Sequence, residues 1–341
     1  MQGGQGDVLM AANGLQALLE LGLPVLAPDA TCYTRTAIVP VIRVMLPGIK
    51  VAPLAESQHA ARPRYATSAK TSWTTVFRNY FTSDWYVNFA ERRRLASFGN
   101  AGPSRHARIE QWITDWKLAS GPRWRRETPS YYGLKMWAPL AEAWSVPEVA
   151  LLKGLYKSYR TMATRLRLHA EAFGHEPAAT LAIFPGGRSF QFIPPDFVRE
   201  LVTTLTISAD EHCCYFAPDD PLIEDYRAVG LACAVTPSIE AMLASIARAK
   251  VAVTADSLAS HVAQLSARLH LALMSHDVPQ HTIHPAAASI VVYEPLECCP
   301  CEYGNRTPGS RCPAGHERCA VFRSCDYRDA ALHALRRLMA S

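Results

Sequence analysis

The sequence predicts an α/β protein whose second half is built on a parallel, doubly wound sheet. From Ala178 onward, short β-rich runs alternate with helices of about ten residues, which is typical of parallel βαβ units. At residues 251–261, a buried strand leads directly into a helix N-terminus, as expected for a βα junction. With 341 residues the chain is too long for one ordinary core, so we expect two domains.

The composition is that of an ordinary globular protein, with 49% hydrophobic and 19% charged residues. No apolar run reaches the roughly 18 residues that indicate a transmembrane helix. The first residues, MQGGQGD, lack the basic and apolar regions of a secretory signal, so we expect a cytoplasmic protein. Six of the ten cysteines lie within residues 298–325, where reduced thiols or a metal site fit better than disulfides.

Basic residues concentrate in the middle of the chain. Residues 62–167 hold 19 Lys and Arg against 7 Asp and Glu, while the remainder is mildly acidic. This asymmetry predicts an anionic partner, which could be an acidic acceptor, an anionic membrane surface or nucleic acid. Arginine clusters at 92–94 and 123–126 alternate with tryptophans, a pattern that suits nucleic acid or a phosphorylated sugar acceptor. An ordinary solvated surface is the alternative.

The N-terminal stretch predicts a glycine-rich turn over residues 3–7 and an amphipathic helix over 8–21. A glycine loop that opens a helix can hold a phosphate or a substrate, although a flexible terminus gives the same pattern. A βα unit begins with a strand and none precedes this loop, so we expect one before it in the native protein. Further elements are expected over 23–27 (strand), 36–45 (helix), 50–54 (strand) and 147–173 (long basic helix).

The C-terminal half predicts a regular series after a linker at 175–177. Asp256 and Ser257 follow one of its strands and are good N-caps, and the free N–H groups of the helix that follows favour a phosphate. A purely capping role is the alternative. Strands are expected over 180–184, 213–217, 232–236, 251–254 and 271–275, and helices over 195–205, 220–229, 238–249, 258–269 and 327–339.

Four short stretches carry a resemblance to a known family. They are Gly6-Asp7-Val8-Leu9, Phe184-Pro185-Gly186-Gly187, the segment from Asp256-Ser257 to His261, and the tail of residues 298–301 and 312–319. In that order they resemble the G-D-hydrophobic loop, the H-P-G-small turn, the D-[ST]-G-x-x-H motif and the C-S-P-C and C-P-x-G-H-x-x-C tail of glycosyltransferase family 9. These are the heptosyltransferase-like enzymes of lipopolysaccharide assembly. The tail is the most specific match, and the basic middle of the chain is not covered.

The resemblance implies the GT-B architecture, in which two Rossmann-like domains face a cleft. Residues 1–174 would bind the acceptor, and residues 175–325, including a cysteine-rich loop at 298–325, would bind a nucleotide sugar. A final helix over 326–341 could pack back on the first domain. The implied reaction moves a sugar, typically heptose from ADP-heptose, to a hydroxyl of a saccharide, lipid-linked or protein acceptor, with inversion and without a catalytic metal. Contact with an anionic inner membrane from the cytoplasm is also compatible, and no nucleic acid is expected.

The resemblance also implies roles for individual residues. Asp7 would be the general base, since a carboxylate near the acceptor hydroxyl can remove its proton as the new bond forms. Preorganised N–H groups and cations would stabilise the leaving diphosphate. The acceptor would contact Gly4, Gln5 and Gly6, and the donor would contact Gly186, Gly187, Arg188, Asp220, Glu224, Asp256, Ser257, Leu258 and His261.

Three departures from the family pattern concern the donor site. Leu258 stands where the family has glycine, Phe184 replaces the usual histidine, and a basic residue is missing around residues 191–193, where Arg188 would have to substitute. These changes leave the sugar and nucleotide open. They also keep a second hypothesis in view, a catalytically silent GT-B binding protein or partner subunit.

The cysteine tail predicts a structural metal site. Cys298, Cys301, Cys312 and Cys319 have a spacing compatible with tetrahedral zinc or iron, and His316 is an alternative ligand. A reduced cluster that packs the loop, or a disulfide, would explain the same residues.

Overall fold

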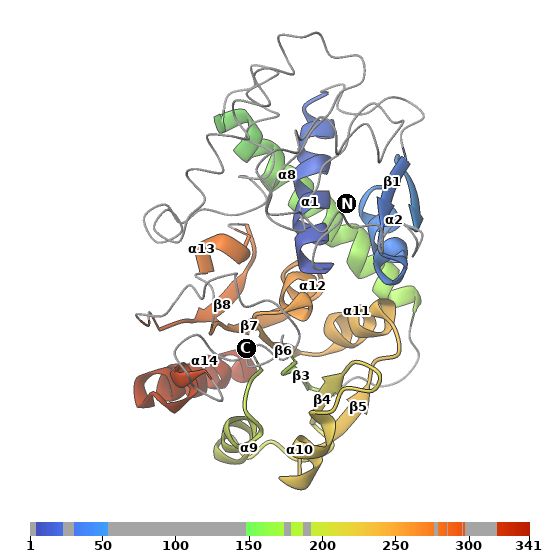
Figure 1. Ribbon diagram of the computed structural model, residues 1–341. Coiled ribbons are helices and arrows are strands. Elements are labelled where there is room, and N and C mark those ends of the chain that lie inside the picture. Colours follow the sequence, from blue (N-terminus) through green and yellow to red (C-terminus); the bar gives the residue numbers. More distant parts are fainter. Residues whose placement is uncertain are drawn as a thin grey trace, which may run out of the picture. The chain divides into compact units, whose positions relative to one another are not determined.

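The computed structural model describes residues 5–22, 31–53, 148–173, 179–186, 192–275, 279–284, 286–294, 296 and 319–341 (Figure 1). Within these residues the chain forms two compact units, which divide between Met162 and Ala163. No helix in the described part is long and apolar enough to cross a bilayer. The expected strand over 23–27 lies outside the described residues.

The first unit contains helix α1 (Gln5–Glu20), strand β1 (Thr31–Thr34), the short helix η1 (Thr36–Ile38), helix α2 (Val39–Met45) and strand β2 (Lys50–Pro53). Strands β1 and β2 are parallel, with Cys32 opposite Val51. Helix α2 packs against both α1 and β2. The expected glycine-rich turn over residues 3–7 is wrong in its second part, because α1 begins at Gln5 and includes Gly6 and Asp7.

Helix α8 (Glu148–Ala172) contacts α1 at a glycine. A Cβ atom added at Gly154 would lie only 3.0 Å from the carbonyl oxygen of Ala17. Since real side chains almost never approach that closely without some shift, the glycine allows the two helix backbones to meet.

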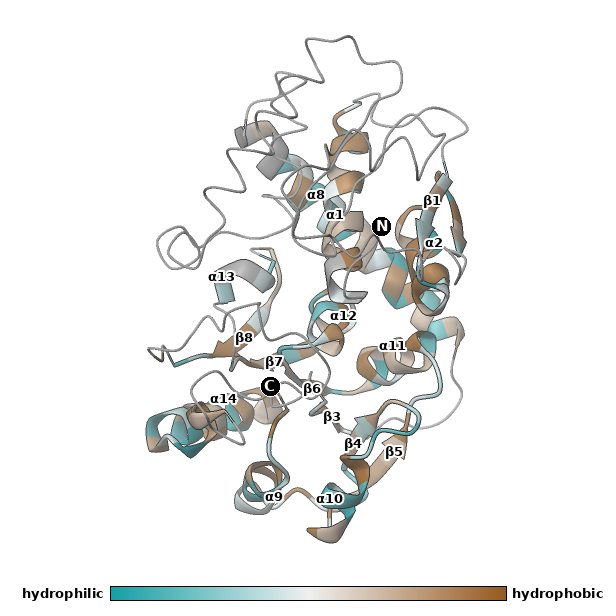
Figure 2. Cartoon of the chain, viewed as in Figure 1, coloured by the Kyte–Doolittle hydropathy of each residue, from teal (hydrophilic) through white to brown (hydrophobic). Residues whose placement is uncertain are grey.

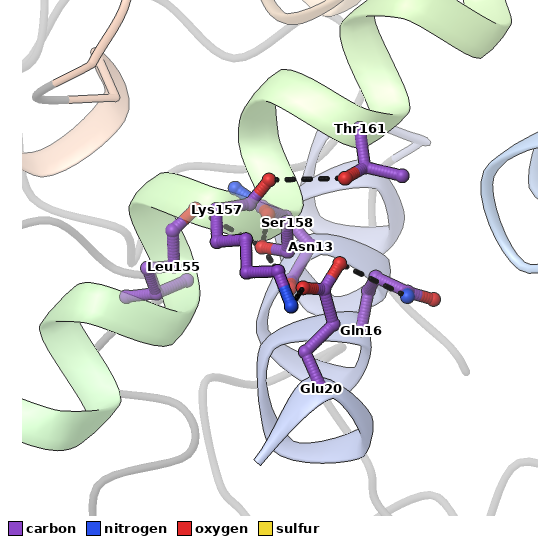
Figure 3. A network of polar contacts seen from close by, with 7 residues as sticks. All are labelled: Asn13, Gln16, Glu20, Leu155, Lys157, Ser158 and Thr161. Atoms are coloured by element: carbon purple, nitrogen blue, oxygen red, sulfur yellow. Dashed lines mark hydrogen bonds and ion pairs between the residues drawn. The ribbon is translucent and has the colours of Figure 1, made fainter.

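A buried hydrogen-bond network joins the same two helices (Figure 3). The hydroxyl of Ser158 donates to Asn13 Oδ1 at 2.6 Å, and both side chains are almost fully buried. At the solvent-facing margin, Lys157 Nζ pairs with Glu20 Oε2 at 2.9 Å. The buried pair is the stronger constraint, because an ion pair with one solvent-exposed partner, here Lys157, contributes little to stability.

The second unit is built on a six-stranded, fully parallel sheet of order β5-β4-β3-β6-β7-β8. The predicted doubly wound sheet is therefore confirmed for this unit. The strands are β3 (Leu181–Phe184), β4 (His212–Phe216), β5 (Cys233–Val235), β6 (Val251–Ala255), β7 (Leu269–Leu273) and β8 (Ser289–Val292).

Helices cover both faces of this sheet (Figure 1). On one face, α9 (Pro195–Thr204), α10 (Ile223–Ala228) and α14 (Cys325–Ala340) enclose the main apolar core, to which the short helix η3 (Ala320–Arg323) also contributes. Helices α11 (Ile239–Arg248) and α12 (Leu258–Ser266) contact each other, and α12 packs on β6 and β7. Helix α14 shows hydrophobic and hydrophilic residues on different sides (Figure 2), and it buries Tyr327, Leu335 and Leu338.

Most of the expected C-terminal elements are confirmed within a few residues. The helix predicted over 258–269 ends earlier, at Ser266, because Ala267 is extended and β7 already begins at Leu269. Strands β1 and β8 and the short helix α13 (Pro279–Thr282) were not predicted.

A buried polar chain crosses three strands of the sheet. Thr254 Oγ1 lies 2.9 Å from His270 Nε2, and His270 Nδ1 lies 2.7 Å from Ser289 Oγ. Burial, with a smaller contribution from the charge of His261, lowers the pKa of His270 to about 3. Burial also lowers the pKa of His284 to about 3. Both imidazoles are therefore neutral inside the folded protein at physiological pH.

We expect Ser158→Ala to lower the free energy of unfolding by about 1–3 kcal/mol, because it leaves the Asn13 amide oxygen buried without its donor. Urea titration measures the change. The matched control is Thr161→Ala on the same helix, whose hydroxyl bonds only to the exposed carbonyl of Lys157 and should cost less than about 0.5 kcal/mol. Equal effects of the two substitutions would contradict this account of the helix contact.

Stability should fall as the pH drops below about 6.5. An unfolded histidine takes up a proton near pH 6.5, whereas the two buried ones take theirs up only near pH 3, so the unfolded state binds more protons between these values. Each histidine should contribute a slope of about 1.4 kcal/mol per pH unit, measured by urea unfolding between pH 7.5 and 5. His270→Gln should reduce the slope by roughly half, and His333→Gln, at an exposed position, should leave it unchanged. A flat profile in the unsubstituted protein would refute the argument.

Candidate functional site

The strand order places a switch point between β3 and β6. From β3 the chain adds β4 and β5 on one side, then returns to add β6, β7 and β8 on the other. The chain continues from β3 to α9 (Pro195–Thr204) on one face of the sheet and from β6 to α12 on the other, so the two connections diverge beyond the carboxyl ends of their strands (Figure 1). In open α/β sheets, ligands bind at such a point.

Two of the predicted donor segments meet there. Phe184 is the register partner of Thr254 on the adjacent strand. Gly186 and Asp256 each follow their paired strand residue by two positions, so the glycine turn and the Asp256-Ser257 segment leave the sheet side by side. Gly187 and Arg188 lie outside the described residues.

Asp220 joins them from the end of β4. A Cβ atom added at Gly186 would lie 3.7 Å from Asp220 Oδ2. The other carboxylate oxygen of Asp220 accepts a hydrogen bond from the Leu222 N–H at 3.1 Å, which fixes the side chain. Asp219, just before it, has a positive φ of 57°, so the chain turns sharply here. Glu224 lies away from this turn on the exposed surface of α10, where it pairs with Arg227 at 2.7 Å.

The N-terminus of α12 has the features that the sequence predicted, with one difference. Ser257 occupies the N-cap position, but its hydroxyl makes no capping hydrogen bond. The first N–H groups of a helix have no acceptor within it, so those of α12 are available for a ligand at the carboxyl end of β6. Asp256 is buried, Leu258 is the first residue of the helix, and His261 lies one turn further on.

A row of buried polar groups extends along the same edge of the sheet. Ala255, Leu273 and Val292 are aligned in register on β6, β7 and β8, and two positions beyond them come Ser257, Ser275 and Glu294. Within the described part of the chain, Ser257 Oγ, Ser275 Oγ and Glu294 Oε2 are buried and have no hydrogen-bond partner. Buried polar groups are nearly always satisfied in proteins, so this row is suited to a ligand or ordered water.

The segment from η3 to α14 is joined to this edge of the sheet by two hydrogen bonds. The phenol of Tyr327 donates to the Met274 carbonyl at 3.1 Å, and the thiol of Cys319 donates to the Ser275 carbonyl at 3.3 Å. Burial, followed by Cys319 and the negative charges of Asp256 and Glu294, raises the pKa of Tyr327. The phenol therefore stays protonated and keeps its role as a donor.

Sequence reasoning missed Ser275, Glu294 and Tyr327. Ser275 and Glu294 directly follow apolar strand runs, which is the signal that could have found them. Nothing in the sequence marks Tyr327, since it reads as an ordinary apolar position of a terminal helix.

The remaining predicted residues are only partly described. Gln5, Gly6 and Asp7 lie in the first turn of α1, and Gly4 is outside the described residues. Of the four cysteines expected to hold a metal, only Cys319 is described, and it is buried in the core of the second unit. Among the described residues no three metal-ligating side chains converge. The metal site stays a prediction.

Comparison with known proteins gives a structural likeness. No protein-family model and no curated protein matches the sequence. The chain is similar to the crystal structure of the glycosyl transferase family 9 from Veillonella parvula DSM 2008, with a TM-score of 0.53 and 13% identity over 100% of this chain and 95% of that one. It also matches the E. coli ADP-heptose lps heptosyltransferase II, with a TM-score of 0.49 and 12% identity over 99% and 97% of the two chains. E. coli heptosyltransferase WaaC with ADP-2-deoxy-2-fluoro heptose gives a TM-score of 0.44 and 14% identity over 86% and 91%.

The likeness to the Veillonella structure extends over the whole chain, including the first unit, where the described residues hold only two strands. The chain therefore has the mixed α/β fold of a GT-B glycosyltransferase.

Proposed function

We propose that this protein is an inverting glycosyltransferase that moves a sugar, with heptose as the preferred candidate, from a nucleotide diphosphate donor to a hydroxyl of a saccharide or lipopolysaccharide-type acceptor. The observation that carries the proposal is the position of the two donor-like segments. The turn at Gly186 and the segment from Asp256 to the start of α12 leave adjacent strands at the switch point. The fold of a family 9 glycosyltransferase supports the same assignment.

The diphosphate would bind at the N-terminus of α12. Its negative charge is favoured by the free N–H groups and by the positive end of the helix dipole. The Ser257 hydroxyl, which makes no capping bond, is available to donate to a phosphate oxygen. Arg188, on the glycine turn, would add a cation as charge builds on the leaving group.

The nucleoside would be held by the carboxylate of Asp220, and the transferred sugar by the carboxylate of Asp256. Asp220 lies beside Gly186 and can accept hydrogen bonds from ribose hydroxyls. Asp256, at the end of β6, can do the same for the hydroxyls of the transferred sugar. Glu224 is a weaker candidate, since it is exposed and already paired with Arg227.

Asp7 would act as the general base. It would take the proton of the acceptor hydroxyl as the acceptor oxygen attacks the anomeric carbon, on the face opposite the departing diphosphate. In this one step the base becomes neutral as it takes the proton, and the diphosphate gains negative charge as it departs. This route needs no catalytic metal.

A structural metal at the cysteine tail is a separate proposal. Cys319 is a hydrogen-bond donor to the Ser275 carbonyl, so it carries its proton there. A metal would have to displace that proton and draw the thiolate away from this carbonyl, since only the thiolate is a good ligand. Metal analysis of the purified protein, with Cys319→Ala for comparison, tests this proposal.

Nucleotide diphosphates should raise the melting temperature selectively. We expect ADP and ADP-heptose to raise it by roughly 4 °C at 100 times their Kd, because a ligand that binds only the folded state stabilises it by about 2.7 kcal/mol. UDP, GDP and CDP forms serve as controls measured in parallel. If a different base is preferred, the donor changes but the class stands. If no nucleotide has an effect on folded protein at millimolar concentration, the proposal fails.

Substitutions at the site should separate binding from chemistry. Ser257→Ala should weaken nucleotide binding about tenfold, the value of one hydrogen bond, while leaving stability nearly unchanged because no capping bond is lost. Glu224→Gln is the matched control and should bind as the unsubstituted protein does.

Asp7→Asn should retain nucleotide binding and lose at least a hundredfold in transfer rate. Titration calorimetry and a transfer assay provide the two readouts, and full transfer by the Asp7 variant would exclude it as the base.

A further inference from the structure

Two cysteines face each other across the outer pair of strands in the second unit. Cys214 on β4 and Cys233 on β5 are direct register partners. Partners on neighbouring strands lie about 4.8 Å apart, within the range that a disulfide spans between its Cα atoms. Register partners also point to the same face of the sheet. The two thiols influence each other's pKa, and the thiol of Cys233 also donates to the Leu231 carbonyl at 3.4 Å.

The two thiols differ in the way that a redox-active pair requires. Cys214 is fully buried, whereas Cys233 is half-buried on the edge strand β5. The interaction with Cys214 lowers the pKa of Cys233, burial opposes it, and the charges of Arg227 and Glu224 act in opposite directions with smaller effects. The same interaction and burial raise the pKa of Cys214. Cys233 is thus the more reactive and more accessible sulfur, with a partner thiol held next to it.

The neighbouring thiol does not share this geometry. Cys213 alternates to the opposite face of β4, where its thiol contacts the Cys214 carbonyl at 3.7 Å. Burial raises the pKa of Cys213 to about 11, so it is a poor nucleophile near neutral pH.

We propose that Cys233 and Cys214 form a redox-modification site, at which a hydroperoxide converts the thiol pair into an intrachain disulfide that links β5 to β4. The site is independent of the proposed glycosyl transfer and does not require it.

The chemistry balances with hydrogen peroxide as the oxidant. The Cys233 thiolate attacks one peroxide oxygen, the O–O bond breaks, and the released hydroxide takes up a proton to become water. Cys233 is then a sulfenic acid. The Cys214 sulfur attacks the Cys233 sulfur, the S–S bond forms and the S–O bond breaks. The departing hydroxide accepts the Cys214 proton as a second water. In total, two thiols and one hydrogen peroxide give one disulfide and two waters.

Peptide mapping of the full chain tests the proposal. The folded protein is treated with hydrogen peroxide near equimolar amounts, its remaining thiols are alkylated, and it is digested with trypsin. Cleavage after Arg199, Arg227 and Arg248 separates the pair, with Cys213 and Cys214 in residues 200–227 and Cys233 in 228–248. We expect the two peptides to be joined, with a mass two hydrogens below their sum. Fragmentation should place the bridge at Cys214.

Three variants give different expected results. Cys213→Ser should keep the bridge. Cys214→Ser should lose it and accumulate a sulfenic acid on Cys233 that dimedone traps. Cys233→Ser should lose the bridge without dimedone labelling of Cys214. Loss of the bridge in Cys213→Ser, or retention of an alkylatable Cys233 while other cysteines oxidise, would overturn the proposal.

Stability provides a second readout that does not depend on labelling. The oxidised protein should melt roughly 5 °C higher than the reduced protein, since the new bond closes a short loop in the unfolded chain. The difference should vanish in Cys233→Ser, whose half-buried position tolerates the change. An unchanged melting temperature in a sample with a proven bridge would show that the bridge forms only after the strands have separated, and would also overturn the proposal.

Discussion

The return of the chain from β5 to β6 across the sheet is the constraint on which the second unit depends. It places β3 and β6 side by side in the middle, buried on both faces, and leaves the loops that follow them to diverge. The polar residues of the candidate site lie together because this strand order makes their strands neighbours. Gly186, Asp220 and the Asp256-Ser257 pair are far apart in the sequence, but all of them lie beyond strand ends at one edge. A sheet with consecutive strand order would have brought different loops together.

The sequence was a good guide where periodicity is strong and where a strand meets a helix directly. The βα series from Leu181 to Leu273 and the Asp256-Ser257 junction were predicted for these reasons. Contacts between residues far apart in the chain could not be predicted from the sequence. The bond between Ser158 and Asn13 joins residues 145 positions apart, and the close helix contact at Gly154 is visible only once both helices exist. The polar row of Ser275 and Glu294 depends on register between strands, which one-dimensional patterns do not contain.

Polar groups in this unit have two distinct roles. The chain of Thr254, His270 and Ser289 is satisfied from end to end and stabilises the sheet interior in its neutral form. At the carboxyl edge, Ser257 Oγ, Ser275 Oγ and Glu294 Oε2 have no partner among the described residues, and the same low-dielectric surroundings make such groups costly without one. The satisfied groups stabilise the framework, and the unsatisfied row at the edge is suited to a ligand or ordered water.

Helix α14 has a consequence for how this protein is made. It covers β7 and β8 and donates the Tyr327 phenol to the Met274 carbonyl, yet it follows all six strands in the chain. During synthesis, residues are added from the N-terminus at a few per second, so the apolar face of these strands emerges from the ribosome before its cover does. The second unit cannot complete its core until α14 is released. The nascent chain would then expose an apolar sheet surface for a time, and such surfaces are prone to aggregation.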